Sequence, residues 1–318
     1  MVSLKRQNPW VIAFSGAILL IGIYTALFAP PSNFPTKSTI TISKGSAAPS
    51  VARQLVDARV IARPSLFLFL LRMTGTSSFI QAGPYRFESP ENLFVVMYRI
   101  VVGDYGLPSV RITFPEGTTV RDAASLIDGN LPEVSDADFL KLAKPYEGYL
   151  FPDTYVFPPS SDASSIVALM RINFNTKIAP LSAEITSSGR SLSDVITLAS
   201  LIEREARSSE SKRMVAGILE NRLKLGMPLQ VDAVFGYIFD RDTYSPSLKD
   251  LTVDSPYNTY THTGLPPGPI CNPGLDSIEA VLNPTKTDNL YYLTGRDGLM
   301  HYATTYAGHQ ANRRKYLR

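Results

Sequence analysis

The sequence predicts an α+β protein in which one N-terminal apolar helix precedes two folded regions of different character. Three observations lead to this fold class. An uncharged apolar run covers residues 10–28. Strand patterns with a glycine turn and an amphipathic helix recur within residues 39–145. From residue 146 onward, long helical patterns alternate with loops rich in proline, glycine and tyrosine.

The composition excludes several classes of protein. Of the 318 residues, 44% are apolar and 19% are charged, so neither a disordered chain nor a polytopic membrane protein is expected. The net charge of +3 comes from scattered Lys and Arg residues, which argues against nucleic acid as a partner. Cys271 is the one cysteine, and the three histidines lack metal-ligand spacing. We therefore expect no intrachain disulfide and no metal site.

The apolar run at residues 10–28 is close to the ~20 residues that a helix needs to cross a bilayer. Lys5 and Arg6 precede it, and no cation follows until Lys37. The positive-inside rule then predicts a cytoplasmic N-terminus (1–8), a transmembrane helix (9–29) and a linker (30–38) that leads to an extracytoplasmic body. A cleavable signal peptide is the alternative, although the run is long for one.

Residues 39–145 contain two similar units, at residues 40–56 and 112–127. Each unit reads as a short strand, a turn at Gly45 or Gly117, and an amphipathic helix. Units that begin in this way resemble small glycan-binding modules of the LysM type. A packing or spacer role is the alternative, so we expect one small LysM-like α+β region here.

A carboxylate stands on the most strongly patterned helix. This helix is expected to begin after Ser191 and to run through Ala206. At about 100° per residue, Glu203 falls on the packed face and Glu205 lies toward the rim. An apolar face favours a protonated carboxyl, which is the form that a general acid needs. The alternative is a buried ion pair, for example between Glu203 and Arg222.

The loops that follow carry groups typical of carbohydrate sites. Residues 147–155 combine acids with aromatic rings, and residues 255–260 offer tyrosines and an asparagine. The proline-rich segment 264–274 suits a rigid binding wall, because such a loop loses little entropy when a ligand docks. The alternative at residues 147–155 is a strand edge with partly buried aromatic rings, and the alternative at residues 255–274 is a structural connector. The candidate substrate-binding residues are Glu147, Asp153, Tyr155, Glu205, Asn221, Arg222, Gln230, Asp232, Tyr257, Asn258, Thr259 and Tyr260.

Six ordered segments carry a resemblance to a known family. They are EGYLFPDTY at 147–155, ASLIERE at 199–205, NRLKLGMPLQ at 221–230, SPYNTY at 255–260, GLPPGPI at 264–270 and NPG at 272–274. Together with the N-terminal apolar run, they resemble the endolytic murein transglycosylase family, also called YceG-like, over nearly the whole chain. The chain departs from the family pattern after Gln230, where residues 231–234 read VDAV instead of the usual Thr-Asp-Pro-Thr. The shape of this loop is therefore uncertain from the sequence.

The resemblance implies a function and a catalytic residue. The catalytic glutamate of the family maps to Glu203, in a catalytic domain at residues 146–318. The implied reaction cleaves the β-1,4 bond between N-acetylmuramic acid and N-acetylglucosamine within peptidoglycan glycan strands. The sugar's own 6-hydroxyl attacks, a 1,6-anhydro end remains, and no cofactor is required. The implied location is the bacterial inner membrane with the catalytic domain in the periplasm, where peptidoglycan synthases are the expected protein partners and termination of nascent strands the expected role.

Two rival functions stay open at the level of the sequence. The first is a muramidase-type hydrolase, in which Asp153, Glu205 or Asp232 assists Glu203. The second is a non-catalytic glycan-binding scaffold for cell-wall synthases, in which Glu203 is structural.

Overall fold

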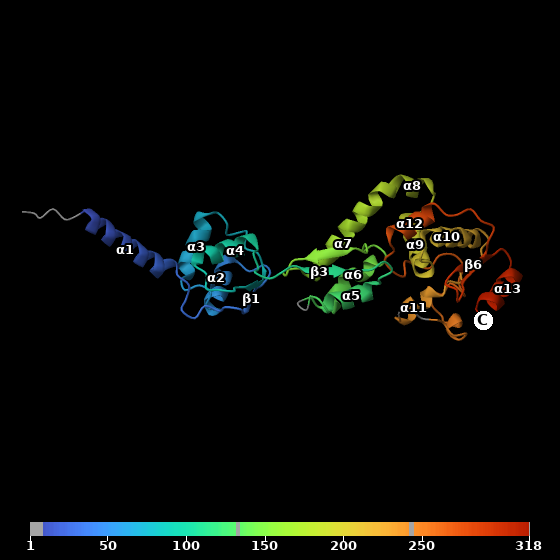
Figure 1. Cartoon of the computed structure of the whole chain (residues 1–318), viewed down its shortest axis with the longest axis horizontal. Coiled ribbons are helices and arrows are strands. Elements are labelled where there is room, and N and C mark those ends of the chain that lie inside the picture. The colour runs from blue at the N-terminus through green and yellow to red at the C-terminus, as the bar shows by residue number, and fades with distance from the viewer. Residues whose placement is uncertain (1–8, 132–133, 242–244, 318) are drawn as a thin grey trace, which may run out of the picture. The chain divides into compact units, whose positions relative to one another are not determined.

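The computed structural model describes residues 9–131, 134–241 and 245–317 (Figure 1). The chain forms two compact units. The first comprises Met1–Val110 with Phe157–Ser161, and the second comprises Arg111–Val156 with Asp162–Arg318. The domain boundary that we expected at residue 145 lies inside the second unit. The reason is that strand β3 (Val110–Thr113), before this boundary, pairs with strand β4 (Thr154–Phe157), after it.

Helix α1 (Pro9–Phe28) begins the described chain. Its C-terminal turn contacts the first unit, because the ring of Phe28 stacks on Phe94 with centroids 4.4 Å apart. In the parts of the chain that the structure describes, no helix meets the length and apolarity required to cross a membrane. The expected cytoplasmic segment 1–8, including Lys5 and Arg6, lies outside the described residues.

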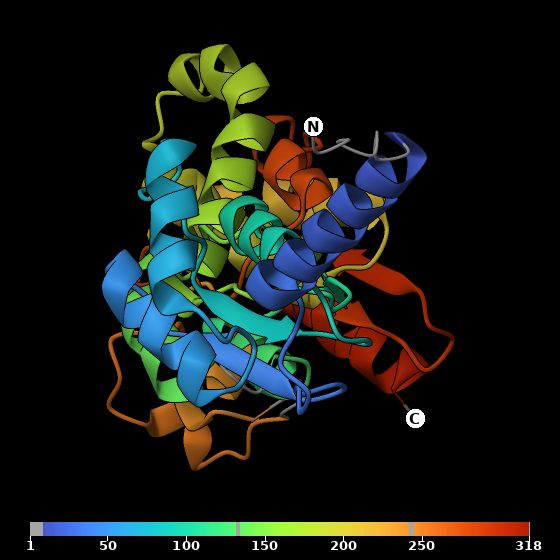
Figure 2. The same ribbon diagram turned by 90° about the vertical axis from the view of Figure 1, so that its left-hand side faces the viewer.

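The body of the first unit is a strand–helix–helix–strand module followed by one more helix, and Figure 2 turns it toward the viewer. Strands β1 and β2 pair antiparallel, with Ile40 opposite Tyr85. The helices bury one apolar stripe each against a common core that includes Leu55 and Phe67. The elements are β1 (Thr39–Ile42), α2 (Ala48–Asp57), α3 (Pro64–Met73), β2 (Gly83–Arg86) and α4 (Leu93–Val102).

The second unit opens with the same order of elements. Strand β3 leads through helices α5 (Val120–Asp128) and α6 (Asp136–Ala143) and a short 3-10 turn (Lys144–Tyr146) to strand β4. Thr119 caps α5 in a capping box with Asp122. The two segments that look alike in the sequence thus both form a strand and a helix, and each begins a module of a strand, two helices and a strand.

The remainder of the second unit is mainly helical (Figure 1). Helix α9 packs against α10, α11 and α12, and its residues from Val195 to Ile202 are all buried. The structure confirms the α+β class and the helix expected after Ser191, which is α9. The elements are α7 (Ala163–Ile178), a 3-10 turn (Ala179–Leu181), α8 (Ser182–Ser187), α9 (Leu192–Glu205), α10 (Ser209–Lys224), α11 (Ala233–Phe239), a 3-10 turn (Asp250–Thr252), α12 (Leu275–Leu282), β5 (Tyr291–Thr294), β6 (Met300–Ala303) and α13 (Tyr306–Tyr316).

Candidate active site

Helix α9 places Glu203 at the edge of the core of the second unit. The side chain of Ser191 caps its N-terminus by accepting a hydrogen bond from the Asp194 backbone. The helix ends at Glu205, so Glu203 lies in the last turn, next to the buried Ile202. Only 8% of the Glu203 side chain is exposed.

Glu203 is held by polar contacts rather than by an apolar face. Lys212 of α10 donates to both carboxyl oxygens, at 3.1 and 3.3 Å. The hydroxyl of Ser277 donates to Oε2 at 2.7 Å, and the backbone N–H of Gly274 donates to the same oxygen at 2.9 Å. A cation, a hydroxyl and the N-terminal end of α12 all favour a negative charge, so these contacts stabilise the carboxylate form.

The ion-pair alternative of the sequence is therefore observed, but with a different partner. We considered Arg222, whereas the structure pairs Glu203 with Lys212, which is 4% exposed. Lys212 also lies 3.6 Å from Asp276 at the first turn of α12. The expected apolar surroundings of Glu203 are wrong, because α10 and α12 each bring a polar group to the end of α9.

Glu203 lines a cavity of about 930 Å³ together with three other acids, Glu116, Glu205 and Asp232. Arg204 and Arg207 lie on the same wall. The cavity thus collects four carboxyls from the turn after β3, the end of α9 and the segment before α11. Of the predicted site residues, the structure brings Glu203, Glu205 and Asp232 together here.

Glu205 belongs to a second polar cluster at the same cavity. Tyr292 of β5 and the backbone N–H of Ala233 donate hydrogen bonds to its carboxyl. Burial, and then the nearby charge of Asp232, raise the pKa of Glu205 to about 7. Asp232 in turn accepts a hydrogen bond from the hydroxyl of Tyr260. Glu205 is the carboxyl that the sequence-based prediction placed toward the rim of the helix.

We expect Glu205 to make the stability of the protein pH-dependent. The folded chain holds a proton on Glu205 that an unfolded chain, with a pKa of 4.5, has already released. The free energy of unfolding therefore falls as the pH rises from about 4.5 through about 7. In thermal unfolding at pH 5 and pH 8, Glu205→Gln should show a smaller fall in Tm than the wild type, by roughly 3 °C. Equal falls in Tm would contradict this assignment.

Glu116 is a cavity residue that sequence reasoning missed. It stands in the turn between β3 and α5, where Gly117 adopts the left-handed conformation with φ of 79°. The N–H of Gly117 donates to the Asn272 carbonyl at 2.9 Å, and the amide of Asn272 donates to the Thr118 carbonyl at 2.9 Å. These hydrogen bonds join two segments that are far apart in the sequence and place Glu116 beside Glu203.

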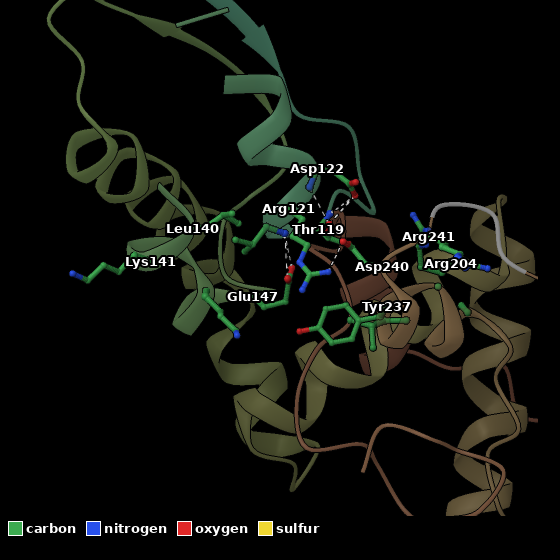
Figure 3. Close-up of a pocket in the computed structure, with 15 residues that line it drawn as sticks. Thr119, Arg121, Asp122, Leu140, Lys141, Glu147, Arg204, Tyr237, Asp240 and Arg241 are labelled. Carbon is green, nitrogen blue, oxygen red and sulfur yellow. Dashed lines mark hydrogen bonds and ion pairs between the residues drawn. The ribbon is translucent and has the colours of Figure 1, made fainter. Parts of the chain in front are cut away.

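Glu147 lines a neighbouring cavity of about 320 Å³, shown in Figure 3. Both of its carboxyl oxygens accept from the backbone N–H of Val120 at the start of α5, and burial raises its pKa to about 7. Arg121 lies beside it and pairs with Asp240, while the ring of Tyr237 faces the same space. The two cavities share lining residues, among them Arg204, so they adjoin one another.

Several predicted site residues instead hold the backbone. Arg222 is 5% exposed and donates to the carbonyls of Leu290 and Leu229, at 2.6 and 2.8 Å. The Asn221 amide donates to the Thr287 carbonyl at 2.7 Å. These contacts attach α10 to the chain that precedes the C-terminal hairpin and to the segment that precedes α11.

The loop at residues 255–260 behaves in the same way. Asn258 is fully buried, and its amide donates to the carbonyls of Leu251 and Val253. The hydroxyl of Thr259, also buried, accepts from the N–H of Val231 at 2.9 Å. The Asn258 amide thus meets backbone carbonyls in this structure, and a substrate contact from it stays a prediction.

The side chains of Gln230 and Tyr257 also meet protein groups. The N–H of Gln230, at φ of 49°, donates to the Thr259 carbonyl, and its side-chain oxygen accepts from Arg222 at 3.4 Å. The ring of Tyr257 lies 5.0 Å from that of Tyr237, centroid to centroid.

The predicted sugar-stacking segment 147–155 divides into two parts. Glu147 reaches a cavity, but Tyr155 is 6% exposed and donates its hydroxyl hydrogen to the Phe151 carbonyl at 2.7 Å. Asp153 accepts from Asn173 of α7 at 3.0 Å, which contributes to a pKa below the usual range of that carboxyl. The Asn173 amide also donates to the hydroxyl of Tyr155, so Asp153 before β4 and Tyr155 within it both contact α7, as in the strand-edge alternative.

The segment VDAV at residues 231–234 forms an ordered helix start. Val231 and Val234 are buried in the core, and Ala233 is the first residue of α11. Asp232 precedes the helix and faces the cavity. The departure from the family pattern thus retains the acid and replaces its neighbours by packing groups.

Comparison with known proteins agrees with the resemblance seen in the sequence. A relative from Bacillus subtilis (strain 168), named endolytic murein transglycosylase, is 31% identical over 94% of this chain and 91% of its own length. A relative with the same name from Streptococcus pneumoniae (strain D39) is 27% identical, over 86% of this chain and 57% of its own. The crystal structure of a yceG-like protein from Listeria monocytogenes superposes with a TM-score of 0.60 at 31% identity, covering 86% of this chain and 98% of the other. The model of the YceG-like family matches residues 40–315, so the chain belongs to this family.

Proposed function

We propose that this protein is an endolytic peptidoglycan lytic transglycosylase. The single observation that carries the proposal is the position of Glu203, which lies at a helix end in a cavity of about 930 Å³ on a chain whose relatives are named endolytic murein transglycosylases. The substrate is the glycan strand of peptidoglycan, cut at the β-1,4 bond between N-acetylmuramic acid and N-acetylglucosamine.

Glu203 is the proposed catalytic acid/base. The reaction needs one proton for the leaving glycosidic oxygen and one acceptor for the proton of the 6-hydroxyl, whose oxygen then closes the 1,6-anhydro ring. Because the nucleophile belongs to the sugar itself, it gains from proximity, and no water has to be activated. The hydrogen bonds from Lys212, Ser277 and Gly274 stabilise a carboxylate, which fits the acceptor step directly.

The remaining acids of the two cavities are proposed substrate contacts. Glu205 and Asp232 line the larger cavity together with Glu203, and Glu147 lines the adjoining one. Carboxyls in such positions accept hydrogen bonds from sugar hydroxyls. A muramidase would use Glu205 or Asp232 to activate a water molecule, so product chemistry separates the two reactions.

The place of action is also a proposal. The uncharged run at residues 10–28, preceded by Lys5 and Arg6, supports anchoring in the bacterial inner membrane with the body in the periplasm. The β1–α2–α3–β2 module is the proposed LysM-like glycan-binding part. An anchored enzyme of this kind would meet nascent strands beside their synthases and terminate their growth.

Oxygen-18 water tests the reaction class. The full chain is incubated with purified, uncross-linked glycan strands in labelled water, and the products are analysed by mass spectrometry. A transglycosylase that cuts within the strand leaves 1,6-anhydro ends without the label, because no water is added to the cleaved bond. Reducing ends that carry the label would show that the protein is a hydrolase, and binding without cleavage would favour the scaffold.

A further inference from the structure

Glu116 and Glu203 reach the same cavity from segments far apart in the sequence. Glu203 comes from the last turn of α9 and is nearly buried, with three protein groups on its carboxyl. Glu116 comes from the turn after β3 and is exposed to the cavity. The two carboxyls thus differ in what surrounds them, although they line one wall.

Gly274 fixes how close the two carboxyls come. Its N–H donates to Oε2 of Glu203 at 2.9 Å. A methyl group placed on its Cα would lie 1.9 Å from Oε1 of Glu116 and 2.8 Å from Cγ of Glu116. Glu116 therefore rests directly on the residue that binds Glu203, in space that any other amino acid at this position would fill.

The two carboxyls have different charged neighbours. Lys212 contacts Glu203 and compensates its negative charge. Partial burial raises the pKa of Glu116, and the charges of Glu203 and then Asp276 raise it further, against the opposing effect of Lys212. A second negative charge beside Glu203 is thus less favourable on Glu116 than on a free glutamate.

We propose that Glu116 is a further catalytic residue that takes over one of the two proton roles given to Glu203 above: Glu116 is the acid that protonates the leaving oxygen, and Glu203 keeps the role of the base. This inference rests on the proposed transglycosylase function. As the bond from C1 of the muramic acid to O4 of the glucosamine breaks, O4 takes the proton of Glu116. The 6-hydroxyl oxygen forms the new bond to C1, and its proton passes to Glu203. Transfer of that proton from Glu203 back to Glu116 restores the starting state, and nothing else is consumed.

A change of leaving group separates the two roles. An acid is needed to expel a sugar alcohol, but not to expel 2,4-dinitrophenolate, which leaves without protonation. The rates are compared on glycan strands and on a muramic acid oligosaccharide that carries a 2,4-dinitrophenyl leaving group. We expect Glu116→Gln to lose about 100-fold or more on strands and to stay within about threefold of the wild type on the activated substrate. Glu203→Gln should lose activity on both substrates.

Gly274→Ala provides a second test that retains both carboxyls. The added methyl group meets the flexible end of Glu116, and the backbone at φ of −74° accepts alanine, so the fold should persist while Glu116 is displaced. Its rates should follow those of Glu116→Gln on both substrates. Equal losses by Glu116→Gln on strands and activated substrate, or no loss on either, would overturn the inference. Failure of the wild type to release anhydro ends would instead overturn the proposed function itself.

Discussion

Replacement of Glu203 by glutamine should reduce cleavage of glycan strands by about 1000-fold or more. An amide of the same shape cannot accept the proton of the 6-hydroxyl, so the acceptor step loses its base. It still accepts hydrogen bonds from Ser277 and Gly274 through its oxygen, and Lys212 keeps Asp276 as an ionic partner at 3.6 Å. Binding of strands should therefore persist. Initial rates are measured by chromatography of released fragments, and binding by co-sedimentation with strands.

Glu210→Gln is the matched control for this change. Glu210 is exposed in the first turn of α10 and lines neither of the two cavities described above. Its replacement by glutamine likewise removes one negative charge, and it should leave the rate within about twofold of the wild type. Full activity of Glu203→Gln would show that this carboxyl is structural.

Replacement of Arg222 by alanine should have the largest effect on stability. Arg222 is 5% exposed, and its guanidinium donates to the carbonyls of Leu290 and Leu229. Without it, buried carbonyls on two segments lose their partners. Each hydrogen bond to a charged group contributes about 1.5–3 kcal/mol, so the free energy of unfolding should fall by about 3 kcal/mol or more. Urea unfolding of the purified full chain measures this change.

Arg213→Ala is the control for the loss of a guanidinium from the same helix. Arg213 is exposed on α10, and its backbone carbonyl accepts from the N–H of Thr285. This variant should unfold within about 0.5 kcal/mol of the wild type. If Arg222→Ala unfolds at the same urea concentration as Arg213→Ala, the assignment of Arg222 to the framework is wrong. If Arg222→Ala then lost affinity for glycan strands, Arg222 would be assigned to the binding site again.

Local patterns in the sequence were sufficient to find α9 and the burial of Glu203. Helical periodicity depends on residues three and four positions apart, and Ser191 marks the start of the helix chemically. The same patterns could not identify Lys212 as the partner of Glu203. That pairing depends on the angle at which α10 turns back against α9. Another partner of Glu203, Ser277 of α12, lies 74 positions further along the chain than Glu203.

Glu116 was missed for a related reason. Its turn reads as the start of a small separate module, and only the pairing of β3 with β4 assigns it to the second unit. The hydrogen bonds of Asn272 then bring it to Glu203. At Asn258, a polar residue between tyrosines suggested a sugar contact. Its amide instead satisfies backbone carbonyls of its own loop, which residue type alone does not indicate.

The most direct test of the account is mass spectrometry of the muropeptides released from uncross-linked glycan strands by the full chain, wild type beside Glu203→Gln. The account predicts that the wild type forms 1,6-anhydromuramyl ends by cutting within the strands and that the variant forms none above background. Anhydro ends from both proteins in equal amounts would contradict the assignment of Glu203, and reducing ends from the wild type would contradict the reaction itself.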